Sequence, residues 1–443
     1  STLDRSSAAS DVYKRQVYGE YAQVDAKTYG GATALYNKKL LNTNLRWEQS
    51  QTFEVGLDIG FLQNRFSFIL DFYSRRTKDL LTKQALPGYT GFSDIVTNMG
   101  TLRNSGFEAE VKANIINKGG FTWDMTANIT SVANKIISLP YNNVENNRVG
   151  GYEVAAGKVD ADGKFPTKWI AGRQEGGKLG ELVGYRQQHV FKDWDDVKQH
   201  ANLRVDEVAN LYGPGLADQI NPATGKTYKE SSGWQPIEPG DACWEDINGD
   251  NIINGYDRSV MGNIFPNVTG GFSTTFGYKG LSLYARFDYA LGHTLYNDLK
   301  ARSLGQYQGQ FNIITDVKDM WSEANPNSDL TKFYYADQLA KKNITRSNNA
   351  STAADNNSSR YYEKGDYLAL REITLSYQLP KSLISKAHLT EASVYVTGQN
   401  LFYITGYDGV SPEPAVSTTY GRGIDNGRYP TPRTFLFGLS LTF

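Results

Sequence analysis

Residues 431–443, with the sequence TPRTFLFGLSLTF, are the most informative stretch of this 443-residue chain. From Phe435 the residues alternate, with Phe435, Phe437, Leu439, Leu441 and Phe443 on one side and Leu436, Gly438, Ser440 and Thr442 on the other. Because strand side chains point to opposite faces in turn, the pattern predicts a β-strand with one strongly apolar face. An apolar edge strand promotes aggregation unless a barrel closes on it, and in lipid only helices and closed barrels satisfy the backbone. We therefore predict an outer-membrane β-barrel, with a water-soluble β-sandwich as the alternative.

The same alternation recurs along the chain, with turn-forming residues between the segments. It is clear at 53–61, 66–73, 107–115, 121–129 and 281–291, and further strands are expected near 270–278, 361–379 and 392–403. Near Arg371 the phase slips by one residue, which predicts a β-bulge. About nine spanning strands result, or about eleven if 136–267 contains a further hairpin.

The connections between these segments favour the barrel over the sandwich. Tight turns are expected around Gln63-Asn64, Lys118-Gly119-Gly120 and Lys279-Gly280, whereas the stretches 83–104, 136–267, 297–360 and 406–430 are long. Short and long connections alternate in outer-membrane barrels, which have periplasmic turns and extracellular loops. The fold class expected is therefore all-β: an antiparallel transmembrane β-barrel with long extracellular loops, 136–267 among them.

Composition excludes several other classes of protein. Mean hydropathy is −0.50 and no run of about 18 apolar residues occurs, which excludes transmembrane helices. The net charge of −1 gives no argument for nucleic acid. The single cysteine, Cys243, cannot form an intrachain disulfide and is expected to be a partly buried free thiol.

The amino terminus and the strand count suggest a partial barrel. Residues 1–16 (STLDRSSAASDVYKRQ) are polar and lack the apolar core of a signal peptide. They resemble a translated sequencing adapter, with a disordered native start as the alternative, so 17–443 is taken as the barrel region. Because bacterial single-chain barrels have even strand numbers, an odd count leads us to expect the carboxy-terminal part of a larger barrel.

One loop has the residue spacing of a calcium site. Oxygen ligands at positions 1, 3, 5, 9 and 12 would be Asp246, Asn248, Asp250, Asn254 and Asp257, with the backbone carbonyl of Ile252 at position 7. Asn251 replaces the usual glycine at position 6, and Asp257 replaces the usual glutamate at position 12. We predict a weak structural Ca²⁺ site of roughly 10⁻⁴ to 10⁻³ M. The alternative is a turn held by bonds from side chains to the backbone.

No pattern in the sequence indicates an enzyme. His189, His200, His293 and His388 are scattered, and neither a nucleophile-elbow nor a phosphate-loop motif occurs. The aromatic residues of the long loops could stack on sugar rings or meet a partner, and loop packing is the alternative. They are Trp169, Trp194, Trp234, Trp321 and Phe333-Tyr334-Tyr335.

Several motifs, in order, give the chain its family resemblance. They are NLRWE at 44–48 with EVGLD at 54–58, FYSRRTKDLL at 72–81, NMG at 98–100 with NSGFE at 104–108, DINGD at 246–250 with DRSVMGN at 257–263, GDYLALREITLSY at 365–377, GQNL at 398–401 and YPTPRT at 429–434. In this order and spacing they resemble the SusC-like (RagA-type) TonB-dependent transporters of Bacteroidetes outer membranes. The resemblance runs from about residue 42 to 443.

That resemblance implies a barrel of about 22 strands around an internal plug. Such proteins import oligosaccharides or peptides beneath a SusD-like lipoprotein, driven by TonB with ExbB and ExbD through the plug region. The TonB box, plug and first half of the barrel have no counterpart in these 443 residues. Two alternatives stay open: a smaller barrel acting as a passive porin or adhesin, and a soluble carbohydrate-binding sandwich.

Overall fold

A computed structural model describes residues 24–37, 39–40, 42–205, 211–231, 234–306, 313–333, 358–413, 416–417, 421–427 and 429–443. Strands dominate these ranges, as the alternation predicted. No helix within them is long and apolar enough to cross a bilayer. Residues 1–16, Tyr334 and Tyr335 lie outside the described residues.

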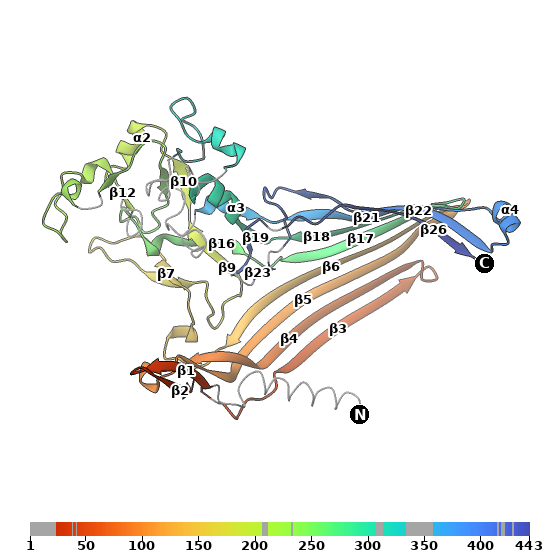
Figure 1. Cartoon of the computed structure of the whole chain (residues 1–443), viewed down its shortest axis with the longest axis horizontal. Coiled ribbons are helices and arrows are strands. Elements are labelled where there is room, and N and C mark those ends of the chain that lie inside the picture. The colour runs from red at the N-terminus through yellow and green to blue at the C-terminus, as the bar shows by residue number, and fades with distance from the viewer. Residues whose placement is uncertain are drawn as a thin grey trace.

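The described residues build one large antiparallel sheet of nine strands, which curves like part of a barrel wall (Figure 1). Its strands are β3 (Gln49–Phe61), β4 (Phe66–Ala85), β5 (Asp94–Lys118), β6 (Phe121–Ser138), β17 (Val268–Tyr278), β18 (Leu281–Leu291), β21 (Tyr367–Gln378), β22 (Glu391–Thr405) and β26 (Thr434–Thr442). Each strand pairs with the next wall strand along the chain, so β3 and β26 are the two edges. The predicted strands and their number are therefore confirmed.

The tight turns lie where the sequence placed them. Lys118 pairs with Phe121 and Tyr278 with Leu281, so each of these hairpins closes with a two-residue turn. Both residues of the Lys279-Gly280 turn have positive φ, which matches the twist of the flanking strands. All the tight turns gather at the end of the wall that carries the C-terminus, and the long loops gather at the other end (Figure 1).

The predicted long connection at 83–104 is wrong. The β4–β5 ladder continues through Lys83, paired with Val96, to Ala85, paired with Asp94, so only residues 86–93 connect the two strands. Alternation predicts strands only where one face is apolar, and this hairpin extends beyond the apolar part of the wall. Its outer segment is instead held by backbone pairing with a neighbour.

The two faces of the wall differ as the alternation requires. On the last strand the apolar side chains Phe435, Phe437, Leu439, Leu441 and Phe443 are between 43% and 86% exposed. Cross-strand rows on this apolar face are continuous, as in Val55–Phe72–Phe107 and in the stacked pair Phe272–Phe287, whose ring centroids are 4.7 Å apart. The opposite face is polar and carries the charged residues of the alternating segments, including Glu54, Asp58, Asp71, Glu108 and Glu110.

The predicted bulge is present at Arg371. The pairing of β21 shifts register between Leu370 and Glu372 relative to β22, and the same place interrupts its pairing with β18. Before the shift Ala369 faces Asp288, and after it Glu372 faces Arg286. The bulge therefore turns the consecutive residues Arg371 and Glu372 toward the same polar face.

A tyrosine lies across a glycine on the polar face of the last hairpin. Tyr395 of β22 is directly opposite Gly438 of β26. A Cβ at position 438 would come within 3.0 Å of three atoms of the Tyr395 ring, so only glycine leaves room for it. Tyr73 lies across Gly106 in the same way. These pairs fix the register of neighbouring strands, because the ring fills the space that the glycine leaves.

The loop region between β6 and β17 folds around a core of its own. Its elements are β7 (Tyr152–Ala155), β8 (Thr167–Ile170), β9 (Glu181–Tyr185), β10 (Gln187–Val190), α2 (Trp194–Gln199), β11 (Arg204–Val205), β12 (Leu211–Tyr212), β13 (Gln235–Pro236), β14 (Ala242–Trp244), β15 (Ile252–Ile253) and β16 (Arg258–Asn263). None of these strands joins the nine-stranded sheet, so the further wall hairpin that would raise the strand count to about eleven is absent from the described residues. Tyr185, Phe191, Val197, Trp244 and Ile253 are 1% exposed or less and pack together.

Shorter elements complete the fold. The remaining elements near the loop end of the wall are β19 (Thr294–Asn297), α3 (Asp298–Ala301), β20 (Tyr362–Lys364), β23 (Val416–Ser417), β24 (Gly421–Arg422) and β25 (Ile424–Asp425), of which Figure 1 labels β19, α3 and β23. β20, β19 and β25 form a small sheet. A hairpin of β1 (Val24–Tyr29) and β2 (Ala32–Asn37) precedes the wall, and the short helix α4 (Lys381–Ile384) lies between β21 and β22.

Candidate functional site

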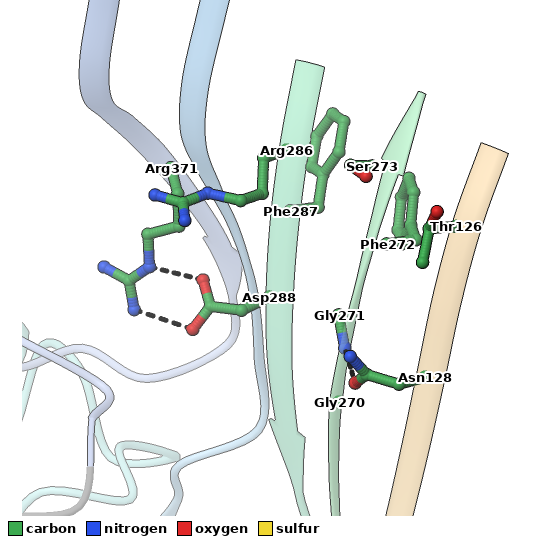
Figure 2. A pocket seen from close by; sticks show the side chains of 10 residues that line it. All are labelled: Thr126, Asn128, Gly270, Gly271, Phe272, Ser273, Arg286, Phe287, Asp288 and Arg371. Atoms are coloured by element: carbon green, nitrogen blue, oxygen red, sulfur yellow. Dashed lines mark hydrogen bonds and ion pairs between the residues drawn. The ribbon is translucent and has the colours of Figure 1, made fainter. Parts of the chain in front are cut away.

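A pocket on the polar face of the wall collects side chains from β6, β17, β18 and β21 (Figure 2). It has a volume of about 440 Å³. We call it the wall pocket. It is lined by Thr126, Asn128, Gly270, Gly271, Phe272, Ser273, Arg286, Phe287, Asp288 and Arg371. Thr126, Ser273 and Arg286 form one cross-strand row, and Asn128, Gly271 and Asp288 form the next. Phe272 and Phe287 belong to the apolar face.

Arg371 organises the charges beside this pocket. Its guanidinium forms a two-pronged ion pair with Asp288, with Nη2 2.9 Å from Oδ2, and also pairs with Glu413. Tyr403 accepts a hydrogen bond of 3.0 Å from Nη1 of Arg371 and donates one of 2.8 Å to Glu413. The planar fork of arginine suits this geometry, whereas a lysine could not bind two carboxylates and a hydroxyl in fixed directions.

Arg286 is the more open cation of the pocket. Its side chain is 55% exposed, and its Nη2 lies 3.8 Å from Glu372, so the pair is loose. Hydroxyl and amide groups of Thr126, Ser273 and Asn128 lie on the same face. The pocket therefore offers both donors and acceptors to a polar ligand.

A second pocket, here the loop pocket, lies among the loops at the other end of β21 and β22. It has a volume of about 560 Å³ and is lined by Gln187, Gln188, His189, Lys300, Asp316, Asp329, Leu330, Ser359, Arg360, Glu363, Gly406 and Asp408. Hydrogen bonds join the segments that form it: the Gln187 amide nitrogen donates to Ser359 Oγ at 3.0 Å, and its side-chain amide donates to the Asp329 carbonyl at 3.0 Å. Arg360 pairs with Asp329 at 3.2 Å, and Lys300 with Asp408.

One segment, residues 406–413, reaches both pockets. Gly406 and Asp408 line the loop pocket, and Glu413 belongs to the Arg371 network beside the wall pocket. Tyr407, between Gly406 and Asp408, is buried, and its hydroxyl donates to Asp425 at 2.8 Å. The two pockets are thus joined by eight consecutive residues, which Tyr407 anchors at the loop-pocket end.

The predicted calcium loop adopts a compact hydrogen-bonded form. Asp246 accepts from the backbone amides of Gly249 and Asn251, each at 2.7 Å. Asn251 has a φ of +63°, the left-handed conformation of the glycine that it replaces, and asparagine tolerates it well. Ile253, at position 8 of the loop, is fully buried in the core of the loop region and ties the loop to it.

Asp257 closes this loop. Its two oxygens accept from the amides of Ile247 at 2.9 Å and Asn254 at 2.8 Å. Burial, together with the nearby carboxylates of Asp246 and Asp250, raises the pKa of Asp257 to about 6, although the two backbone hydrogen bonds act to lower it.

These contacts bear on the predicted metal ligands. The carboxylates of Asp246 and Asp257 are held by backbone amides, as the turn alternative requires. Within the described ranges no group of three or more His, Cys, Asp or Glu side chains is arranged to hold a metal ion. The Ca²⁺ site at Asp246, Asn248, Asp250, Ile252, Asn254 and Asp257 therefore stays a prediction.

The other residues that the sequence singled out occupy separate places. Cys243 is buried, more completely than expected, and burial raises its pKa to about 12. His189 and His200 both lie against Asp196, His293 is buried beside Pro412, and His388 lies near the wall's turn end.

The loop tryptophans do not meet in one site. Trp169 stacks under the guanidinium of Arg148, whose Cζ is 3.6 Å from the ring centroid, and Trp234 stacks on Tyr212 at 5.0 Å. Trp321 donates to the carbonyl of Lys192, and Trp194 is about half exposed at the start of α2. Loop packing therefore explains Trp169, Trp234 and Trp321.

With a wall of this form, a polar inner face and long loops at one end, the molecule is of the outer-membrane barrel class. The profile of the family described as TonB dependent receptor-like, beta-barrel matches residues 7–233, which is more than half of the chain. The chain belongs to this family.

Among its relatives, TonB-dependent receptor P3 of Formosa agariphila is 28% identical over 408 residues, covering 91% of this chain and 35% of that protein. TonB-dependent receptor SusC of Bacteroides thetaiotaomicron is 28% identical over 434 residues, covering 96% of this chain and 35% of SusC. The chain thus spans about a third of the length of these relatives. Their names are those of receptors, not of enzymes.

Among solved structures, the RagAB peptide transporter matches with a TM-score of 0.64 at 21% identity, covering 96% of this chain and 39% of the matched chain. This likeness concerns the fold alone, and it confirms the all-β barrel architecture. Together with the family, it makes the apolar face of the wall the lipid face and the polar face the lumen face. The soluble sandwich alternative is therefore wrong.

Proposed function

We propose that this chain forms the barrel part of a SusC-like importer, which takes up an oligosaccharide or a peptide across the outer membrane. The observation that carries the proposal is the pair of polar pockets joined by residues 406–413. A ligand held among the loops would meet Asp408, and one in the lumen would meet the Arg371 network through Glu413. A ligand that moves residues 406–413 in one pocket would thus also move the part of this segment that borders the other pocket.

The chemistry of the two pockets suits a ligand rich in hydroxyl or amide groups. Gln187, Gln188 and Ser359 offer neutral donors and acceptors, and most of the charges nearby are already paired. Among the described residues that line the loop pocket, His189 carries the single ring. Hydrogen bonding rather than ring stacking would therefore hold the ligand there, which both glycans and peptides permit.

The proposed partners follow from the family resemblance. A SusD-like lipoprotein would lie over the loops, and TonB with ExbB and ExbD would supply energy through a plug encoded with the rest of the transporter. The ligand would be released into the lumen when the plug moves. A passive porin would need neither partner.

Uptake of labelled oligosaccharides and peptides by the source bacterium tests the proposal. Arg371→Met should lower uptake of one ligand class, because it removes the ion pairs that hold Asp288 and Glu413. The matched control is Arg76→Met, which removes an exposed arginine from the outer face of β4. Collapse of the proton-motive force should stop uptake in the unmodified strain.

Two outcomes would contradict the proposal. If deletion of the gene leaves uptake of every labelled ligand unchanged, the importer function is wrong. If uptake continues after the proton-motive force collapses, the passive porin replaces it.

A further inference from the structure

A shallow apolar groove runs along the lipid face of β22, near the turn end of the wall. It has a volume of about 560 Å³ and is lined by Leu281, Leu375, Ser376, Tyr377, Val394, Tyr395, Val396, Phe437, Gly438 and Leu439. Ser376, Tyr395 and Gly438 belong to the lumen face by alternation, so they line it through their backbone. The groove is separate from both polar pockets.

The groove exists because short side chains lie between long ones. In one cross-strand row Val394 lies between Tyr377 and Leu439, and in the next Val396 lies between Leu375 and Phe437. Strands two apart are separated by roughly 10 Å, so the long side chains form two parallel ridges with a valine floor. Such a trough accepts a single extended hydrocarbon chain, which would contact both ridges at once.

The groove ends at the short helix α4. Ala392, the next lipid-face residue of β22, is 2% exposed, and α4 packs on β22 beside it with Ile384 buried. Lys381 begins α4 and Lys386 follows it, and both side chains are exposed. A hydrocarbon chain in the groove would therefore end beside a helix that carries Lys381 and is followed by Lys386.

A third lysine, Lys279, lies in the tight turn next to Leu281, at the turn end of the wall. The ammonium of Lys279 is 5.2 Å from the centroid of the Tyr278 ring, and Tyr278 is opposite Leu281, which lines the groove. In the described part of the chain none of Lys279, Lys381 and Lys386 has a carboxylate partner. Lysines at this depth extend their ammonium groups toward the interface, where lipid phosphates lie.

We propose that this groove binds one phospholipid with an anionic head group, taken from the leaflet that faces the periplasm. One acyl chain lies along the valine floor, and the head-group phosphate lies among Lys279, Lys381 and Lys386. Tight turns of outer-membrane barrels face the periplasm, which places the lysines at the head groups of that leaflet. The three unpaired cations favour a phospholipid over an apolar protein ridge, which would leave them without an anion.

The test is lipid retention by the protein purified from outer membranes in mild detergent. The protein is exposed to equal concentrations of phosphatidylglycerol and phosphatidylcholine, and native mass spectrometry counts the bound lipids. We expect one retained phosphatidylglycerol. Lys381→Glu should weaken its retention at least about fivefold, the effect of one basic side chain near a lipid surface. Val396→Phe should fill the groove and remove the retained phosphatidylglycerol.

Matched controls separate the groove from the rest of the wall. Val55→Phe enlarges a lipid-face valine on β3, and Lys118→Glu reverses a lysine at another tight turn, so both should retain lipid like the unmodified protein. Val396→Ile adds a single methylene and keeps the test valid if Val396→Phe fails to fold. Equal retention of the two lipids would overturn the lysine site, and unchanged retention in both Val396 variants would overturn the groove.

Discussion

Replacing Gly438 by alanine should destabilise the wall only while Tyr395 is present. A Cβ at position 438 would lie within 3.0 Å of the Cζ, Oη and Cε1 atoms of the Tyr395 ring, so the ring must leave its place. Tyr395 is 41% exposed, and the ring would turn toward the lumen. Exposing roughly 50 Å² of it costs about 1 kcal/mol, and forced repacking typically costs about 1–3 kcal/mol. We therefore expect a loss of about 1–3 kcal/mol in the free energy of unfolding.

A double-mutant cycle measures this effect. Gly438→Ala, Tyr395→Ala and the double variant are unfolded with urea from lipid vesicles, and tryptophan fluorescence reports the transition. The coupling energy should be about 1–2 kcal/mol, because alanine at 438 meets no ring in the Tyr395→Ala background. Gly56→Ala is the matched control, since the added Cβ meets only the flexible carboxylate end of Asp71. An equal cost of Gly438→Ala in both backgrounds would refute the reasoning.

Three further outcomes can be checked on the same protein. Calcium should bind with a dissociation constant of roughly 10⁻⁴ to 10⁻³ M and raise the melting temperature of the protein, and Asp250→Ala should abolish this rise. If calorimetry detects no Ca²⁺ binding, the loop is a turn held by bonds from side chains to the backbone. With calcium chelated, stability should rise as pH falls from about 6 toward 3.8, because burial lifts the pKa of Asp257 and the folded chain then binds a proton that the unfolded chain lacks. Asp257→Asn should flatten that slope in urea titrations at each pH. Cys243, whose pKa is raised to about 12 by burial, should resist a thiol reagent at pH 8 until the loop region unfolds, so rapid labelling of the folded protein would contradict its burial.

The wall of this protein could be predicted from its sequence because lipid imposes a strict period of two. Wherever one face meets lipid, as at Phe435–Phe443, the alternation located the strand and assigned its faces. The phase slip at Arg371 was visible for the same reason. Where a strand extends beyond the lipid, its residues no longer need to alternate between apolar and polar. The sequence pattern therefore missed the part of the β4–β5 hairpin that continues through Val96.

The candidate site was mostly beyond the reach of the sequence. Arg371, Asp288 and Glu413 lie on three separate segments, and Glu413 follows Arg371 by 42 residues. Strand alternation placed Asp288 on the polar face but gave no indication of a partner. The core around Trp244 was also missed, because strands of two to five residues leave too short a pattern to recognise.

The independent core of the loop region has a consequence for how such proteins diversify. Its buried side chains pack on one another, and its strands do not pair with the wall. Substitutions on its surface are therefore constrained by solubility and by binding partners, whereas substitutions on the apolar face of the wall are constrained by contact with lipid. Substitutions on the outer surface of this region can therefore change what it binds while the lipid-facing side chains of the wall stay the same.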